Sequence, residues 1–151
     1  MLLTRRELSL LMPALAAALD VSAAQAPPSP APGGTEIGGS QTFRYEDLTA
    51  TPNGPGASRQ MLRTRTHSGY RLEIHETELP GGKAPHPPHQ HVHEELMLIR
   101  EGTMDVTIAG KTTQLGPGSC VYIASNEMHG WRNAGTGVAR YFVLALGDDN
   151  V

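Results

Sequence analysis

Four of the seven histidines of this 151-residue chain lie within eight residues: His86, His89, His91 and His93. Glu95 follows them closely, and a further histidine, His129, stands alone downstream. Side chains two apart on an extended strand project to the same side, so His89, His91 and Glu95 share a face if this segment is a strand. Imidazoles and a carboxylate gathered on one face are typical of a metal site. The spacing predicts where the chemistry occurs, but not which reaction it is.

Short strands must position these residues. Apolar and polar side chains alternate through Tyr70–His75 and Met104–Ile108, which is the pattern of half-buried strands. Further extended segments are predicted around Phe43–Tyr45, Met61–His67, Glu95–Ile99, Ser119–Ala124 and Ala139–Leu146. The 17 glycines and 12 prolines favour turns over long helices. Roughly eight short strands without a sustained helical period predict an all-β antiparallel barrel or jelly roll.

One strand is apolar on both faces. An antiparallel strand with one face in water should alternate apolar and polar residues, but Leu96–Ile99 is apolar throughout. Either the segment Gln41–Leu48 or a second copy of the chain is expected to cover its outer face, and we favour a homodimer. Cys120 is the only cysteine, so no internal disulfide forms, and its apolar strand context predicts a buried, inert thiol.

The N-terminal residues have the pattern of an export signal. Arg5 and Arg6 precede an apolar stretch, Leu8–Leu19, that is too short to span a bilayer, and small residues follow to Ala26. We expect a signal peptide over 1–24, of twin-arginine or ordinary secretory type, in a bacterial protein that is periplasmic or secreted. A proline- and glycine-rich linker is predicted over 25–40, and the folded domain over 41–147.

Composition narrows the partners. The net charge is −3, and the basic residues are scattered, so a nucleic-acid partner is not expected. The mature chain contains no candidate membrane span. A small-molecule ligand or substrate is the expected partner.

Two spaced motifs contain the histidines. In the first, Gly82, His89, His91, Glu95 and Gly102 are separated by six, one, three and six residues. In the second, Gly118, Ala124, Asn126, His129 and Asn133 are separated by five, one, two and three residues. With this pairing, the chain from about Glu73 to Leu146 resembles the cupin superfamily. Ala124 and Asn126 replace the usual proline and glycine, and asparagine tolerates the positive φ expected at its position.

The resemblance implies a small single-domain (monocupin) jelly-roll β-barrel with a metal held by His89, His91, Glu95 and His129. Three imidazoles and one carboxylate suit Mn, Fe, Co, Ni, Cu or Zn rather than Ca or Mg. Such a set leaves one or two positions of an octahedron open. A divalent ion with one carboxylate carries about +1, which favours bound organic anions.

Other side chains are expected near the ligands. His86 and His93 are predicted either at the rim of the pocket or beside a ligand that they orient, without binding the metal, and Met97 is predicted to line the interior. Trp131 is expected either to line the pocket or to belong to the core. Arg63, Arg65 and His75 either reach a substrate or are solvated.

Two functions remain open at this point. The first is a metal-dependent enzyme acting on a small oxygen-rich organic anion, of dioxygenase or isomerase/lyase type, in which Glu95 is a candidate base. The second is a non-enzymatic protein of the same fold that binds metal or a small sugar or acid.

Overall fold

The computed structural model describes residues 38–148, which form nine β-strands and one short 3-10 helix. The elements are η1 (Tyr45–Asp47), β1 (Thr51–Asn53), β2 (Gly56–Arg65), β3 (Arg71–Leu79), β4 (Glu94–Glu101), β5 (Met104–Ile108), β6 (Lys111–Leu115), β7 (Cys120–Ile123), β8 (His129–Asn133) and β9 (Ala139–Leu146). The predicted signal peptide and nearly all of the predicted linker lie outside the described residues. Within residues 38–148, no helix has the length and apolar character needed to cross a membrane.

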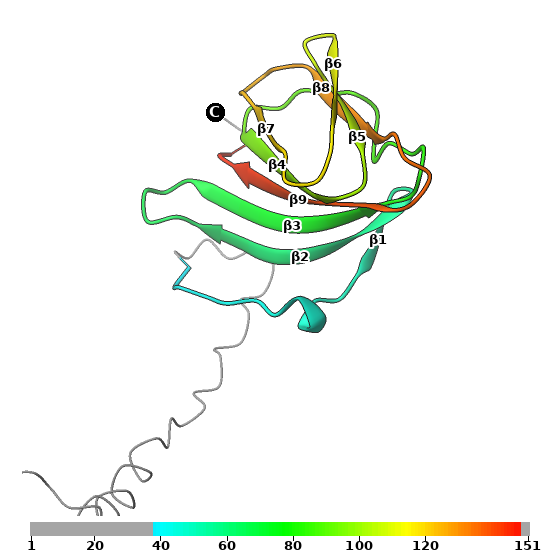
Figure 1. Cartoon of the computed structure of the whole chain (residues 1–151). Helices are drawn as coiled ribbons and strands as arrows, with labels where there is room; N and C mark the ends of the chain where they lie inside the picture. The colour runs from blue at the N-terminus through cyan, green and yellow to red at the C-terminus, as the bar shows by residue number, and fades with distance from the viewer. Residues whose placement is uncertain (1–37, 149–151) are drawn as a thin grey trace, which may run out of the picture.

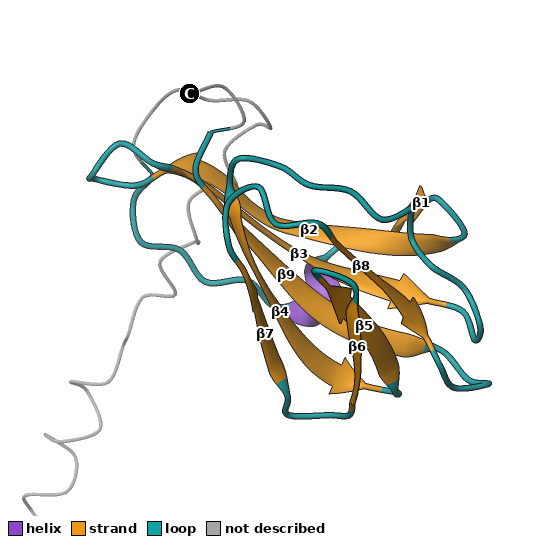
Figure 2. Cartoon of the chain, turned by 90° about the horizontal axis from the view of Figure 1, so that it is seen from above, coloured by secondary structure: helices purple, strands orange, loops and turns teal. Residues whose placement is uncertain are grey.

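The strands form two antiparallel sheets. The larger has the order β1-β2-β3-β9-β4-β7, and the smaller has the order β6-β5-β8. In Figure 1 the smaller sheet lies above the larger one, and Figure 2 shows the same two layers from above. No ladder joins the two sheets among the described strands, so the prediction of a closed barrel is wrong. The double-sheet jelly-roll form of the all-β prediction is the one that the chain adopts.

The strand expected at Phe43–Tyr45 is also wrong. Tyr45–Asp47 forms the 3-10 helix η1, in which the Leu48 N–H donates to the Tyr45 carbonyl over 3.2 Å. Arg44 donates to Glu46 over 2.9 Å from Nε, a local contact that closes the chain into a turn. Three alternating residues were too short a pattern to outweigh such local bonding.

The apolar core fills the space between the sheets. It contains Leu79, Met97, Ile99, Met104, Val106, Val121, Ile123, Trp131, Ala139, Tyr141 and Val143. Because strand side chains alternate, the residues between these positions on the larger sheet face outward. On β7, Val121 and Ile123 are buried while Cys120 and Tyr122 are exposed. The prediction of a buried Cys120 is therefore wrong, because this side chain lies on the outward-facing side of β7.

The larger sheet is apolar on its outer face at one end. Ile74, Leu144, Leu96 and Tyr122 pair in one row across four strands, and Phe142, Leu98 and Cys120 pair in the next. We call these seven residues the outer apolar patch. Leu98 is 43% exposed and Tyr122 is 58% exposed. In the described chain, nothing shields these two side chains from solvent.

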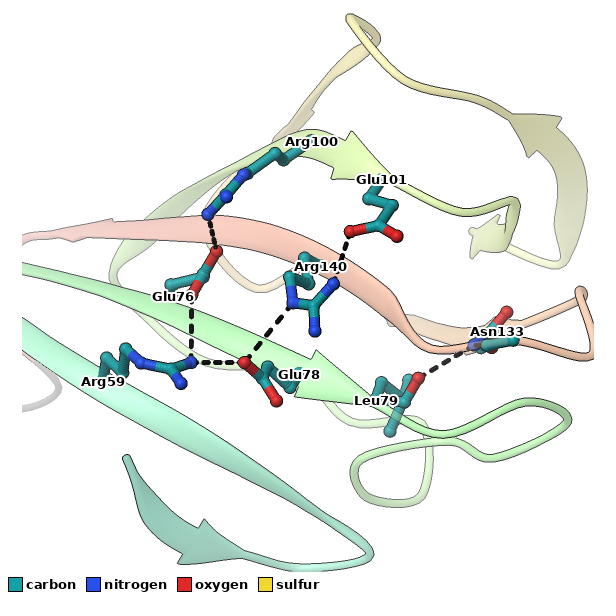
Figure 3. Close-up of polar contacts among 9 residues, drawn as sticks. Arg59, Glu76, Glu78, Leu79, Arg100, Glu101, Asn133 and Arg140 are labelled. Atoms are coloured by element: carbon teal, nitrogen blue, oxygen red, sulfur yellow. Dashed lines mark hydrogen bonds and ion pairs between the residues drawn. The ribbon is translucent and has the colours of Figure 1, made fainter. Parts of the chain in front are cut away.

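The rest of the outer face is charged and covered, beginning with Glu76, which pairs with Phe142 of the second row. Glu76 is fully buried there, accepting from Arg100 over 2.7 Å and from Arg59 over 3.3 Å. Figure 3 shows these contacts continuing through Glu78 and Arg140. The ring of Tyr45 lies against both Arg59 and Arg100, at 5.0 and 4.6 Å from the guanidinium carbons. The segment Gln41–Leu48 thus covers the charged end through Tyr45 and leaves Leu98 exposed.

Candidate metal centre

His129 begins β8 and is held there by a tight turn. Asn126 adopts φ 60°, and its N–H donates to the His91 carbonyl over 2.7 Å. The expectation that this position has positive φ is confirmed, and asparagine bears that conformation at little cost. The turn leaves the Glu127 carbonyl 2.8 Å from Nδ1 of His129.

The loop before β4 carries the other histidines beside β8. His89 and His129 exchange two backbone hydrogen bonds of 2.9 Å each, an isolated antiparallel bridge. Gly130 favours this close approach, because a Cβ at that position would lie 3.1 Å from the Cα of Pro88, a tight contact. Two segments about forty residues apart in sequence are therefore fixed side by side by backbone contacts.

Four side chains converge at this junction. His89, His91 and His129 each offer a ring nitrogen, and the three nitrogens lie within 4.8 Å of one another. Oε2 of Glu95 lies 3.2 Å from Nε2 of His91 and 3.4 Å from Nε2 of His129. Transition metals bind imidazole and carboxylate donors at about 2.0–2.2 Å, so neighbouring donors around one ion are separated by about 3 Å. The two distances from Glu95 fit that requirement, and the three ring nitrogens lie around the same point.

Backbone carbonyls set the tautomers of two of these rings. Nδ1 of His91 donates to the His93 carbonyl over 2.8 Å, as Nδ1 of His129 does to Glu127. A carbonyl only accepts, so the proton resides on Nδ1 and the lone pair on Nε2 faces the junction. Nε2 of His129 and Nδ1 of His89 are buried without a hydrogen-bond partner in residues 38–148. Buried polar atoms without partners are costly, and a bound cation would satisfy them.

The neutral form of His89 is strongly favoured. Burial, together with the neighbouring rings of His86, His129, His91 and His93, lowers the pKa of His89 to about 4. A histidine must be neutral to bind a metal. His89 is therefore ready to act as a ligand at any pH above about 5.

The remaining predicted residues surround this cluster without joining it. His86 is exposed and meets His89 edge-on at 4.3 Å between ring centres, while His93 stacks on His91 at 3.6 Å. Trp131 stacks beside His129 at 5.8 Å and belongs to the buried core. Met97 is fully buried in the core.

A cavity of about 180 Å³ adjoins the cluster on the side of Glu95. Its lining comes from Arg71, Glu73, His75, His93, Glu95, Val143, Ala145 and Gly147. Of the three residues considered for substrate contact, His75 lines it, whereas Arg63 and Arg65 do not. Sequence reasoning missed Arg71 and Glu73. The sequence signal that could have found them is their two-residue spacing from His75, which places all three side chains on one face of β3.

Comparison with known proteins supports this architecture. The family described as "Cupin domain" matches residues 75–145. An RmlC-like cupin from Shewanella frigidimarina superposes with a TM-score of 0.62 at 15% identity, over 74% of this chain and 95% of its own. A polyketide cyclase from Streptomyces resistomycificus superposes with a TM-score of 0.58 at 21% identity, over 74% of this chain and 82% of its own. A predicted oxalate decarboxylase from Thermotoga maritima superposes with a TM-score of 0.59 at 19% identity, over 72% of this chain and 100% of its own.

At these sequence identities the solved structures show that the fold is shared, and they do not indicate an activity for this chain. No curated protein sequence matches the chain. The family match covers β4, β7, the smaller sheet and all of β9 except Leu146, and it includes all four residues of the cluster. This chain belongs to the cupin superfamily as a single cupin domain.

Proposed function

We propose that His89, His91, His129 and Glu95 hold one divalent transition metal ion, and that the protein is a metal-dependent enzyme acting on a small organic anion. The observation that carries the proposal is the convergence of these donors, two of whose buried ring nitrogens have no hydrogen-bond partner in the described part of the chain. Three imidazoles and one carboxylate suit Mn, Fe, Co, Ni, Cu or Zn. When bound, such an ion supplies Lewis-acid or redox chemistry.

Metal content of purified variants tests the ligand assignment. His129→Ala and Glu95→Ala each remove one donor, so we expect both to fall well below one metal ion per chain. His67→Ala is the matched control, because His67 is exposed and lies outside the cluster. Elemental analysis after equilibration with each metal gives the stoichiometry. Full metal content in both cluster variants would overturn the assignment.

The cavity beside Glu95 supports an enzyme over a metal store. Glu95 borders both the histidine cluster and the cavity, so its carboxylate is placed to exchange a proton with a ligand in the cavity. Oxygen uptake with phenols and 1,3-diketones separates the reaction classes. Uptake by the iron-, copper- or manganese-loaded protein supports a dioxygenase, and isomerisation or cleavage without uptake supports an isomerase or lyase. Binding of acids without turnover would instead support the alternative, a non-enzymatic binding protein.

We also propose that the protein acts as a homodimer. The outer apolar patch supports this, because Leu98 and Tyr122 are exposed within it. A second copy presenting the same patch would cover it by two-fold symmetry.

Export is a further proposal, and it rests on residues 1–24 alone. We expect the mature chain to begin after Ala23 or Ala24 in a bacterial periplasm or culture medium. Mass spectrometry of the protein from cell fractions tests this. Replacing Arg5 and Arg6 by lysine separates the two routes, since a twin-arginine signal requires the arginine pair. An uncleaved chain confined to the cytoplasm would refute export.

A further inference from the structure

The cavity beside the histidine cluster exists because β9 contributes small residues at this point. Glu73 on β3 and Glu95 on β4 both pair with Ala145, from opposite sides. Adjacent strands are about 4.8 Å apart, so β3 and β4 lie about 10 Å apart across β9. Ala145 fills little of that width, and Gly147 beside it has no side chain. The result is a cavity with the metal candidates on the β4 side and titratable residues on the β3 side.

The charges on the β3 side do not cancel. Glu73 accepts from Nη2 of Arg63 over 2.9 Å, and Nη2 of Arg71 lies farther away, at 3.6 Å. Contact with His75 and the charge of Arg63 lower the pKa of Glu73, so this carboxylate is ionised at neutral pH. One negative charge thus faces two guanidinium groups, and Arg63 is the closer of the two.

Arg71 is the cation left over. Among the described residues its side chain makes no hydrogen bond, and the 3.6 Å contact with Glu73 is too long to be one. The side chain is 39% exposed and lines the cavity. Nearby Arg65 is engaged by Asp148 at 3.0 Å, so it does not compete for a ligand in the cavity. A guanidinium with free donors at a cavity wall matches a planar carboxylate, which it can bind through two parallel hydrogen bonds.

We propose that Arg71 determines substrate specificity by binding the carboxylate of a small organic acid, whose other end lies against the histidine–Glu95 cluster. The inference deepens the function proposed above and rests on it for the identity of the cluster as a metal site. The cavity volume of about 180 Å³ limits the acid to a few carbon atoms, because sites for drug-sized ligands occupy about 300–1,000 Å³. A divalent ion partly neutralised by Glu95, together with Arg71, makes the cavity cationic at both ends.

Calorimetric titration with malonate tests the proposal, with malonamide as the uncharged analogue of the same size. We expect malonate to bind the zinc-loaded protein and malonamide not to bind. Arg71→Gln should weaken malonate binding roughly tenfold to a hundredfold, the usual cost of losing a charge-assisted pair. Arg71→Lys should fall between, because lysine keeps the charge without the planar fork. Zinc content should be unchanged in both variants.

Three further variants distinguish an effect at the cavity from general effects of mutation. Arg132→Gln removes an arginine from the other sheet and should leave malonate affinity unaltered. Ala145→Leu fills the cavity floor beside Glu95, so malonate binding should be lost at unchanged zinc content, whereas Ala145→Ser should retain malonate binding. Equal malonate affinity in Arg71→Gln and the unmodified protein overturns the inference. So does failure of malonate to bind the unmodified protein.

Failure of the metal site is a separate result. If the unmodified protein takes up no zinc or other transition metal, the proposed function fails, and titration of the metal-free protein decides the role of Arg71. Malonate binding that depends on Arg71 then supports the inference, and its independence of Arg71 overturns it.

Discussion

The indole of Trp131 sits between the histidine cluster and the apolar core. Its ring stacks beside His129, and its Nε1–H donates to the Tyr141 hydroxyl over 3.0 Å. Burial raises the pKa of Tyr141 to about 12, so this hydroxyl stays protonated in ordinary buffers. The pair satisfies two polar groups inside a core that is otherwise apolar.

Removing the acceptor should therefore be costly. Tyr141→Phe leaves the Trp131 N–H buried without a partner, and we expect the free energy of unfolding to fall by about 1–3 kcal/mol. Urea unfolding followed by the fluorescence of Trp131, the only tryptophan, measures the change. Tyr70→Phe is the control, since Tyr70 is 58% exposed and should change stability little. A Tyr141→Phe variant as stable as the unmodified protein would show that this bond contributes nothing net.

Acid sensitivity of the metal-free protein should originate in part at His89. The pKa of His89 is about 4 in the folded chain and near 6.5 when unfolded, so between these values the unfolded state binds more protons. Stability from this group is complete above about pH 6.5 and is lost as the pH falls to about 4. We expect the urea midpoint to decrease from pH 7 to pH 5, and to decrease less in His89→Gln. His67→Gln should follow the unmodified protein. Identical pH dependence in His89→Gln would contradict the assignment.

At the scale of single elements, the β5–β6 hairpin contains a strained residue. Ile108 pairs with Lys111, so the loop consists of Ala109 and Gly110, with φ 47° and 81°. Positive φ at both positions is the type I′ turn that suits the twist of a hairpin. Alanine pays a steric penalty there of about 1–2 kcal/mol that asparagine largely avoids.

Ala109→Asn should therefore raise the free energy of unfolding by about 0.5–1 kcal/mol. The backbone bond from the Ala109 N–H to the Met128 carbonyl, 2.9 Å long, is retained because it involves no side chain. Ala109→Val tests the same strain in the opposite direction and should be destabilising, since a β-branched residue tolerates positive φ least. Thermal or urea unfolding measures both variants. The prediction fails if asparagine gives no gain over alanine.

The elements also show where prediction from sequence reached its limit. Most strands followed from local patterns, because alternation is a local property, whereas the positive φ at Asn126 was expected from the resemblance to cupins. The placement of His129 beside His89 came from the resemblance to cupins, since spacing alone cannot bring distant segments together. Closure of the barrel was predicted incorrectly, because pairing between sheet edges leaves no local signature.

The two faces of β3 illustrate the same limit. Alternation of Leu72 and Ile74 with Glu73 and His75 indicates two different faces but not which one is internal. The pairing of Ile74 with Leu144 places the apolar set on the outer face, and Glu73 and His75 line the cavity. Beside the cavity, β3 is polar on its inner face and apolar on its outer face, which reverses the usual rule for a strand. Arg71 and Glu73 share the face of His75 in the sequence pattern, but only the long-range pairing shows that this face is internal.

At the scale of the whole molecule, the polar inner face of β3 relates the cavity to the proposed dimer interface. The end of the larger sheet that surrounds the cavity is the end whose outer face carries the outer apolar patch. Exposed contiguous apolar surface is unfavourable in water and commonly marks an interface. Tyr45 covers only the charged end of this face, where it contacts Arg59 and Arg100. A second copy of the chain is the proposed cover for the remainder.

A charge placed in the patch should separate the dimer without unfolding the chain. Leu98 is 43% exposed, so Leu98→Lys is tolerated in the monomer, but in a two-fold interface it buries a charge near its symmetry mate. We expect sedimentation analysis to give a dimer for the unmodified protein and a monomer for Leu98→Lys. Val138→Lys is the matched control, because Val138 is 41% exposed and lies outside the patch.

The single thiol reports on the same surface independently. Cys120 belongs to the patch and is exposed in one chain, so a dimer should protect it from alkylation and Leu98→Lys should restore its reactivity. If the unmodified protein sediments as a monomer and Cys120 reacts as fast as a free thiol, the second copy is excluded as the cover of this face. The inverted polarity of β3 would then be explained by the cavity alone. Placing charged groups toward the cavity would leave the apolar residues of β3 on the outer face because strand side chains alternate.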